Sequence, residues 1–241
     1  MHRGSKTCQA LGEGRSLHSA YSTISMGKTL MMAPLTINPD VATFINVFTV
    51  EPFRQNVLVN RIKFDAETTI CKQAGFIRAI VHRSLDGSKV VNLVQWESVE
   101  ASRAIHHNPD IAASFASYQE LGVRMDLRYY ETALMTAQPF TIQTHDGLMA
   151  QIDVLQVAPD DPQLLLEYAR QHSNPAIASA DDRSTVWFRS LDGIRVIRFS
   201  YSQGSNHNEN TQVFATENWI EQVTSHCYQV EFVITKQSLL V

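Results

Sequence analysis

An imidazole, an amide and an indole lie in one short stretch of the chain, at His82, Asn92 and Trp96. Asn92 interrupts the apolar run from Val90 to Val94, which is an unusual place for a side-chain amide. A buried amide or indole needs a hydrogen-bond partner, and a bound small molecule is one such partner. An imidazole can carry a proton near neutral pH. We therefore expect Asn92, Trp96 and His82 to be the catalytic residues of a small-molecule site.

The loop between the two strands that carry these residues decides which side chains meet. A three-residue loop with Gly87 in the left-handed position pairs Ile80 with Asn92. A two-residue turn instead pairs His82 with Val91 and puts His82 and Asn92 on opposite faces. We favour the three-residue loop because it gathers five residues on one face: Phe76, Ile80, His82, Asn92 and Trp96. The opposite face is then apolar: Ile77, Ala79, Val81, Val91 and Leu93.

The spacing on this face indicates the kind of ligand. Asn92 and Trp96 are four residues apart on one strand, a span of roughly 13 Å. That span fits a flat polycyclic molecule held beneath the helices. Asn46, on the preceding strand, faces the same way. We expect Asn46, Phe76 and Ile80 to contact the substrate.

The strands and helices around these residues are expected in the order β-α-β-β-α-β. A helix follows the first strand, because apolar residues recur there every four positions until Gly75 ends the pattern. Ser98 can cap the second helix, which must break before Pro109. The expected strands span residues 43–50, 76–84, 89–96 and 127–135.

The chain contains this arrangement twice. The pentapeptide Arg83–Gly87 recurs as Arg189–Gly193, and Ile45–Pro52 matches Ile152–Pro159. Two matches in the same order at nearly the same offset indicate a tandem duplication. The sequence therefore predicts three parts: a disordered leader at 1–40, a first domain with the site at 41–138 and a degenerate second domain at 148–238.

The strands at 76–84 and 89–96 are apolar at nearly every position, which indicates that both faces of their sheet are covered. Helices cover only one face of a ferredoxin-like domain, and the fused copy can cover the other. The predicted fold class is α+β, with two tandem ferredoxin-like domains packed sheet to sheet as an intramolecular version of a homodimer.

The second copy keeps the turn and the strand pattern but not the polar residues. Its counterparts of the three catalytic candidates are Phe188, Arg198 and Ser202. If folding required the polar residues, both copies should keep them. One active cavity beside one degenerate half is the simpler account, and drift at the fused interface is the alternative.

The composition excludes several classes of function. A net charge of −4 gives no reason to expect nucleic acid or an anionic membrane as a partner. The longest apolar stretches are only strand-sized. Cys8, Cys71 and Cys227 form no C-x-x-C pair, and the sequence has neither a metal-spaced His/Asp cluster nor a G-x-G-x-x-G turn after a strand. We therefore expect a cytoplasmic protein with no metal and no cofactor.

The run from Gly75 to Ser98 resembles the antibiotic-biosynthesis monooxygenase family, above all in His82-Arg83-Ser84-Leu85-Asp86-Gly87 and Val90-Val91-Asn92-Leu93-Val94-Gln95-Trp96-Glu97. The resemblance is good over residues 43–136 and weak over 150–237. It implies the dimeric α/β-barrel fold and a cofactor-independent oxidation of anthrone-type aromatic polyketides to quinones. It also implies a pocket lined by the matching His, Asn and Trp.

Three positions depart from relatives in this superfamily. The helix tyrosine of the best-known family members falls at Ser102 here. The helix tryptophan and axial histidine of haem-degrading relatives fall at Ile105 and Phe115. Neither residue can ligate haem, so a haem-dependent activity is set aside.

Together these features predict a cofactor-independent monooxygenase for an electron-rich aromatic molecule. A phenolic or anthrone substrate can give an electron to O₂ once it is deprotonated, so the protein need only exclude water, orient the substrate and move a proton. A polyketide cyclase and a non-catalytic small-molecule binder on the same fold stay open as alternatives. The expected partners are the aromatic substrate and O₂. Homo-oligomerisation beyond the intramolecular pseudo-dimer is left open.

Overall fold

The computed structural model describes residues 34–136, 139–144, 147–157, 162–172, 184–202 and 219–236. Most of the predicted leader, residues 1–33, lies outside this part of the chain. The end of that leader is ordered, since Leu35–Ile37 forms strand β1 and pairs antiparallel with β6 (Phe140–Ile142). The apolar side chains of this small sheet are buried.

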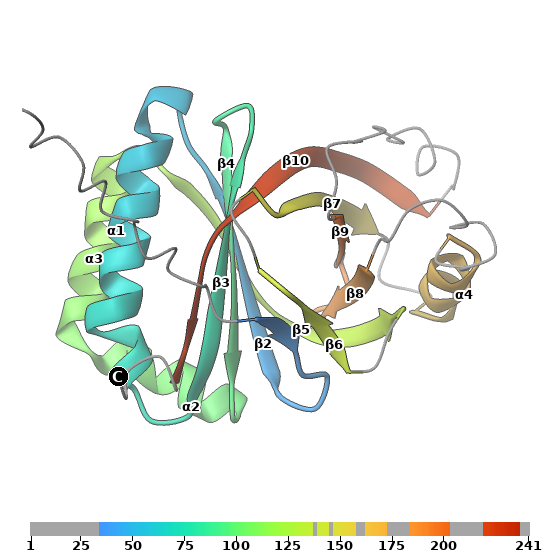
Figure 1. Cartoon of the computed structure of the whole chain (residues 1–241), viewed down its shortest axis with the longest axis horizontal. Coiled ribbons are helices and arrows are strands. Elements are labelled where there is room, and N and C mark those ends of the chain that lie inside the picture. The colour runs from blue at the N-terminus through green and yellow to red at the C-terminus, as the bar shows by residue number, and fades with distance from the viewer. Residues whose placement is uncertain are drawn as a thin grey trace, which may run out of the picture. The chain divides into compact units, whose positions relative to one another are not determined.

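Eight antiparallel strands close into a barrel: β2 (Ala42–Thr49), β3 (Phe76–Ser84), β4 (Lys89–Trp96), β5 (Arg124–Met135), β7 (Met149–Val157), β8 (Ser184–Ser190), β9 (Arg195–Ser202) and β10 (Ile220–Thr235). Their order around the barrel is β10-β3-β4-β2-β5-β8-β9-β7 (Figure 1). The long strands β5 and β10 join the halves, because β5 pairs with both β2 and β8 and β10 with both β3 and β7. Closure leaves the barrel without an unpaired edge.

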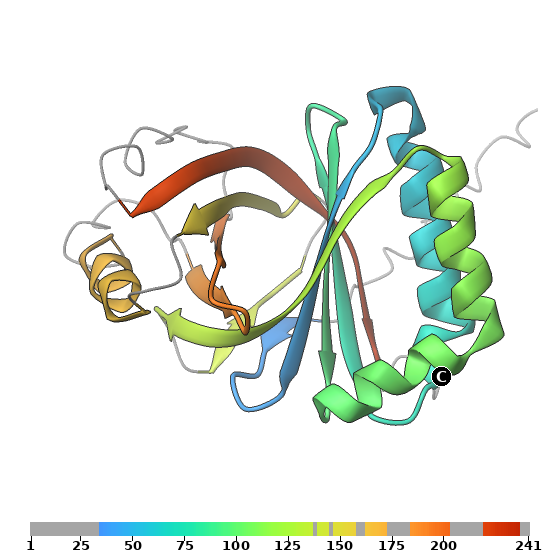
Figure 2. The same ribbon diagram turned by 180° about the vertical axis from the view of Figure 1, so that it is seen from behind.

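Two helices cover the outer face of the first four strands. α1 (Gln55–Thr68) and α3 (Pro109–Glu120) lie side by side there (Figures 1 and 2). α2 (Val99–Ala104) begins at Ser98, whose side chain accepts the Ala101 N–H, as the sequence predicts. Short 3₁₀ turns complete this layer: Pro52–Arg54, Ile70–Lys72 and Ile105–His107.

The second half carries α4 (Pro162–His172) on the opposite side of the barrel (Figure 1). A second helix is also expected there, between β9 and β10. The segment between these two strands, residues 203–218, lies outside the described part of the chain.

Two apolar cores lie on the two faces of the first four strands. The barrel interior is filled from both halves, for example by Ile45 and Leu93 from the first and Ile152 and Phe199 from the second. The other core lies between the strands and the helices α1 and α3. The α+β architecture is confirmed, and the apolar strand pattern is explained because both faces are buried.

The hairpin between β3 and β4 differs from the expected one. Four residues, not three, connect the strands, and the Gly87 N–H donates to the Ser84 carbonyl at 3.2 Å. The Asp86 carboxylate accepts the Ser84 hydroxyl and the Ser88 N–H. The Ser84 hydroxyl oxygen in turn accepts the Lys89 N–H at 2.8 Å. These side-chain bonds stabilise the longer loop and shift the register by one residue.

This shift moves two of the expected site residues to the other face of the sheet. His82 lies opposite Val91, and Ile80 lies opposite Leu93. The prediction that His82 and Ile80 share a face with Asn92 is therefore wrong, and the alternative register is the one adopted. Successive side chains of a strand alternate between faces, so one residue of shift is enough to separate them.

Candidate functional site

A cavity of about 60 Å³ lies between the outer face of the sheet and the helix layer. Strands β2, β3 and β4 form its floor, and α1, α3 and the turn at Ile105 form its roof. This is where the sequence predicts a ligand, beneath the helices. The lining residues are Phe44, Asn46, Phe48, Ile62, Asp65, Ala66, Ile70, Ala79, Asn92, Val94, Trp96, Ile105, Ile111, Ser114, Phe115 and Tyr118.

Two amides stand side by side on the floor of this cavity. Asn46 on β2 lies directly opposite Asn92 on β4. The Oδ1 atoms of both are buried, and neither has a hydrogen-bond partner within the described residues. An unpaired buried polar atom costs about 1–3 kcal/mol of stability. Such a cost is explained if these oxygens, and the amide groups that carry them, are kept for a ligand.

The indole of Trp96 adds a donor to the same floor. Its Nε1 is also buried without a partner among the described residues. The ring is held edge-on by Phe76, with 5.6 Å between centroids. Phe76 reaches this face because the β3 register shifts between Phe76 and Arg78, which restores its pairing with Trp96. The structure therefore brings Asn46, Asn92 and Trp96 together, whereas Phe76, predicted to contact the substrate, packs against Trp96 and does not line the cavity.

A charged network faces the amides from the helix layer. The Tyr118 hydroxyl of α3 donates to Asp65 Oδ2 of α1 at 2.7 Å. Arg61 forms an ion pair with the same carboxylate at 3.2 Å and donates to the Ser114 hydroxyl at 3.2 Å. Burial and the neighbouring carboxylate raise the pKa of Tyr118 well above its usual range. The cavity thus contains one carboxylate and a neutral phenol.

Sequence reasoning missed Asp65. The signal is its place three residues after Ile62, which puts a carboxylate on the buried face of an otherwise apolar helix stripe. A carboxylate has about four acceptor positions. The acceptor positions of Asp65 that Tyr118 and Arg61 do not use remain available for a proton from a bound molecule.

Comparison with known proteins supports the resemblance found in the sequence. Tetracenomycin-F1 monooxygenase from Streptomyces glaucescens is 38% identical over 84 residues, which are 35% of this chain and 75% of that protein. The chain belongs to the antibiotic-biosynthesis monooxygenase family. A scan against protein-family profiles finds no match.

Solved structures of other proteins share the barrel fold of this chain. The crystal structure of an anthrone oxidase-like protein matches with a TM-score of 0.66 at 17% identity, over 85% of this chain and 97% of that one. A protein assigned as a monooxygenase from Fusobacterium nucleatum matches with a TM-score of 0.58 at 10% identity, over 83% and 96% of the two chains. At these identities the likeness shows the fold alone.

His82 and Ile80 do not line the cavity of this monooxygenase-family protein. Both are buried in the barrel interior, where His82 Nε2 lies 3.0 Å from the Tyr201 hydroxyl and Nδ1 lies 3.3 Å from the Val91 carbonyl. Burial lowers the pKa of His82 to about 4. The imidazole is therefore neutral at neutral pH and lies on the wrong face of the sheet for the expected proton transfer.

Ser102, at the position compared with the family's helix tyrosine, contacts a tyrosine of β5. Ser102 is fully buried, and its hydroxyl oxygen accepts a hydrogen bond of 3.1 Å from the Tyr129 hydroxyl of β5. The Tyr129 ring packs on Phe44, a lining residue, at 4.7 Å between centroids. Ile105 and Phe115, the positions compared with haem-degrading relatives, are apolar walls of the cavity.

The second half repeats the floor geometry of this family's fold with different chemistry. Asp153 on β7 lies opposite Arg198 on β9, just as Asn46 lies opposite Asn92. The carboxylate and guanidinium form an ion pair at 2.7 Å. The Arg198 guanidinium lies over the Trp187 ring at 5.6 Å.

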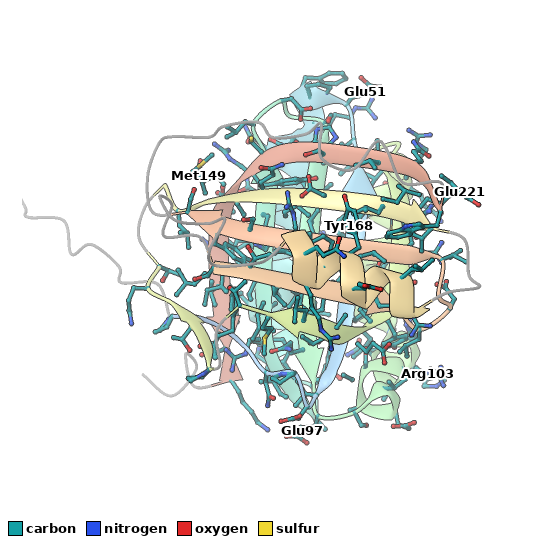
Figure 3. All side chains as sticks on the ribbon, turned by 90° about the vertical axis from the view of Figure 1, so that its right-hand side faces the viewer. Glu51, Glu97, Arg103, Met149, Tyr168 and Glu221 are labelled. Carbon is teal, nitrogen blue, oxygen red and sulfur yellow. The ribbon has the colours of Figure 1, made fainter. Side chains whose placement is uncertain are left out.

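A helix covers this second floor as well. Tyr168 of α4 packs edge-on against Trp187 at 6.4 Å between centroids, and Figure 3 shows it on the helix that crosses these strands. The equivalent position is therefore filled by an ion pair and aromatic rings.

Two features are absent among the described residues. None of their helices is long and apolar enough to cross a membrane. No three His, Cys, Asp or Glu side chains gather there in an arrangement that could hold a metal ion.

Proposed function

We propose that this protein is a cofactor-independent monooxygenase that oxidises an electron-rich, anthrone-like polyketide with O₂. One observation carries the proposal: Asn46 Oδ1, Asn92 Oδ1 and Trp96 Nε1 are buried at one apolar cavity and have no hydrogen-bond partner among the described residues. Amides and an indole N–H match the hydroxyl and carbonyl oxygens of such a substrate. The relationship to tetracenomycin-F1 monooxygenase supports a substrate of this class.

The reaction begins with removal of a substrate proton. Asp65 is the acceptor in our proposal, because its carboxylate lines the cavity while His82 lies across the sheet. The Trp96 Nε1–H and the side-chain amide N–H of Asn92 donate hydrogen bonds to the substrate oxygen on which negative charge develops, and the Asn46 and Asn92 Oδ1 atoms accept from the substrate's hydroxyl groups. Donors fixed in an apolar site stabilise such charge more strongly than water does.

The deprotonated substrate then supplies the electrons that reduce O₂. In the overall change the anthrone methylene carbon loses two hydrogens and gains a doubly bonded oxygen atom from O₂. The second oxygen atom takes the two hydrogens and leaves as water, so atoms and electrons balance without an added reductant. The apolar walls keep water from the reactive carbanion.

Substrate binding must enlarge the cavity. Its volume of about 60 Å³ is well below the roughly 300–1,000 Å³ typical of sites for drug-sized molecules. We propose that the roof around Ile105 and Phe115 moves outward on binding, since it consists of short helical segments on a rigid sheet.

We also propose that the chain is a tandem pair of ferredoxin-like units, at 41–138 and 148–238, with the site in the first. The matching pairs Asn46–Asn92 and Asp153–Arg198 support this, because both occupy the same register in their halves. The Streptomyces relative supports it too, since the matched segment is three quarters of that protein but only a third of this chain.

The test is oxygen consumption by chelator-treated protein given an anthrone. We expect stoichiometric O₂ uptake and quinone formation, both reduced about tenfold or more in Asn92→Ala. Asn60→Ala, an exposed amide on the outer side of α1, is the matched control and should keep full activity. Product formation without O₂ uptake would identify a cyclase instead. Saturable binding without any product would identify a binder, the alternative that Ser102 in place of the family tyrosine favours.

A further inference from the structure

The barrel interior has a polar end that the proposed oxygenation does not use. At one end the apolar residues of β1 and β6 are part of the interior core, and Phe140 packs against Tyr201 near the end of β9. At the other end, where β9 begins with Arg195, the interior opens into a cavity of about 350 Å³. This space is larger than the cavity beneath the helices.

Both halves of the chain build this end. Val47 and Thr49 of β2, Lys89 of β4 and residues at the start of β5 line it from the first half. Gln156 of β7, Arg195 of β9 and residues of β10 line it from the second. Either half alone would form only one side of this cavity.

The charges in the cavity are not balanced. Its lining carries three cations, Lys89, Arg124 and Arg195, against the single carboxylate of Asp126. That carboxylate is already engaged, by Arg128 at 2.7 Å and by Arg195 at 3.3 Å. Lys89 and Arg124 therefore have no carboxylate partner in the lining of this cavity.

These two cations face the same space. The Lys89 ammonium donates to the Thr49 hydroxyl at 2.8 Å, and burial together with the charge of Arg124 lowers the pKa of Lys89. Within the described residues Arg124 forms no ion pair of its own. The charge of Asp86 acts on Lys89, but the Asp86 carboxylate is already hydrogen-bonded to Ser84, Ser88 and His226.

We propose that this end of the barrel binds a small organic anion, a carboxylate or a phosphate ester, between Lys89 and Arg124. An anion relieves the repulsion between the two cations. The half-buried Lys89 ammonium gains more from such a partner than an exposed lysine does, and Arg124 supplies the second charge from the exposed rim of the cavity. The Thr49 hydroxyl offers a hydrogen bond, while Val47 and Val154 offer apolar contact to an organic group. The site is distinct from the amide floor, because residues 47 and 49 point to the opposite face of β2 from Asn46.

Calorimetric titration of the full-length protein with phenyl phosphate, at fixed ionic strength, tests this site. We expect saturable 1:1 binding that weakens tenfold or more in Arg124→Gln and in Lys89→Met. Lys72→Gln removes an equal charge from an exposed position that does not line this cavity, and this variant should bind as the unaltered protein does. Asn92→Ala should also bind normally, which separates this site from the proposed oxygenase site.

Two parallel titrations sharpen the result. Phenol tests whether the charge is needed, and inorganic phosphate tests whether the organic group is needed. Phenol should not compete, and phosphate should bind at least tenfold more weakly than the ester. Absence of saturable binding, equal loss in Lys72→Gln, or equal affinity for phosphate and the ester would overturn the proposal.

Thermal melting without ligand gives a second readout. If the two cations are held against their repulsion, Arg124→Gln should melt at a higher temperature than the unaltered protein at low salt. The difference should shrink as phenyl phosphate is added, because only the unaltered protein gains stability from the ligand. A lower melting temperature in Arg124→Gln would show that the charge serves folding, and would count against the site.

Discussion

Asn46 on β2 lies directly opposite Asn92 on β4, and the carboxamide oxygens of both are buried at an apolar cavity without a partner among the described residues. A pair of unsatisfied amides weakens a fold. Their presence is therefore better explained by binding than by packing, and that distinction can be measured.

Asn92→Leu should raise stability while it lowers activity. Leucine has nearly the same shape and leaves no buried oxygen unpaired, so the free energy of unfolding should rise by about 1 kcal/mol. Turnover of an anthrone should fall about tenfold or more because a hydrogen bond to the charged substrate is lost. Urea denaturation and an oxygen electrode measure the two effects. A variant that is both less stable and fully active would mean that the amide serves the fold.

Trp96→Phe should lower kcat with little change in KM. The substitution keeps an aromatic ring against Phe76 but removes the only hydrogen-bond donor that the indole offers. A loss confined to kcat indicates an interaction that strengthens in the transition state. Steady-state kinetics provide the measurement, and an unchanged kcat would leave the indole as a packing residue.

Arg198 in the second half should matter for stability and not for turnover. Arg198→Ala leaves the buried Asp153 carboxylate without its counter-charge, which typically costs about 3–5 kcal/mol. Replacing both residues with asparagine restores a neutral pair like that of the first half and should cost less. Denaturation curves of the single and double variants give the comparison. Similar losses in both would refute the role assigned to the ion pair.

His82 should make the fold sensitive to mild acid. Burial lowers its pKa to about 4 in the folded protein, whereas an unfolded histidine titrates near 6.5. The unfolded chain therefore binds more protons between these values. The stabilisation is complete above about pH 6.5 and declines as the pH falls towards 4, by about 3 kcal/mol in total.

The double variant His82→Phe, Tyr201→Phe tests this without leaving either hydrogen-bond partner unpaired. Melting curves between pH 7 and 4 should lose most of their acid dependence, and turnover at pH 7 should stay within a factor of about two. Loss of turnover in a well-folded double variant would show that His82 takes part in the reaction after all.

Much of the site floor could be predicted from the sequence, because alternation along one strand is a local property. Asn92 and Trp96 are four residues apart on β4 and must share a face, and alternation along β2 points Asn46 the same way. His82 could not be placed with the same reliability. Its face depends on whether the loop after Ser84 has three residues or four, and side-chain bonds of Asp86 decide that.

Features that depend on distant pairing were beyond sequence reasoning. Asp65 meets Tyr118 only because α1 and α3 pack side by side, which no local pattern specifies. The polar end of the barrel likewise requires β10 to cross between β7 and β3. The ordered strand at Leu35–Ile37 was missed because three residues are too few to show a period.

Asp65→Asn should block the first step of the proposed reaction without unfolding the protein. The asparagine oxygen can still accept the Tyr118 hydroxyl, so the contact between α1 and α3 survives, but the side chain no longer takes up a proton. Deprotonation can be observed apart from oxygen chemistry by following exchange of the anthrone methylene hydrogens in D₂O by NMR under anaerobic conditions. We expect protein-catalysed exchange to fall at least tenfold in Asp65→Asn, about the lower end of what one general base contributes. Tyr118→Phe keeps the carboxylate and removes only its hydrogen bond, so exchange should persist. Undiminished exchange in Asp65→Asn would exclude this carboxylate as the base.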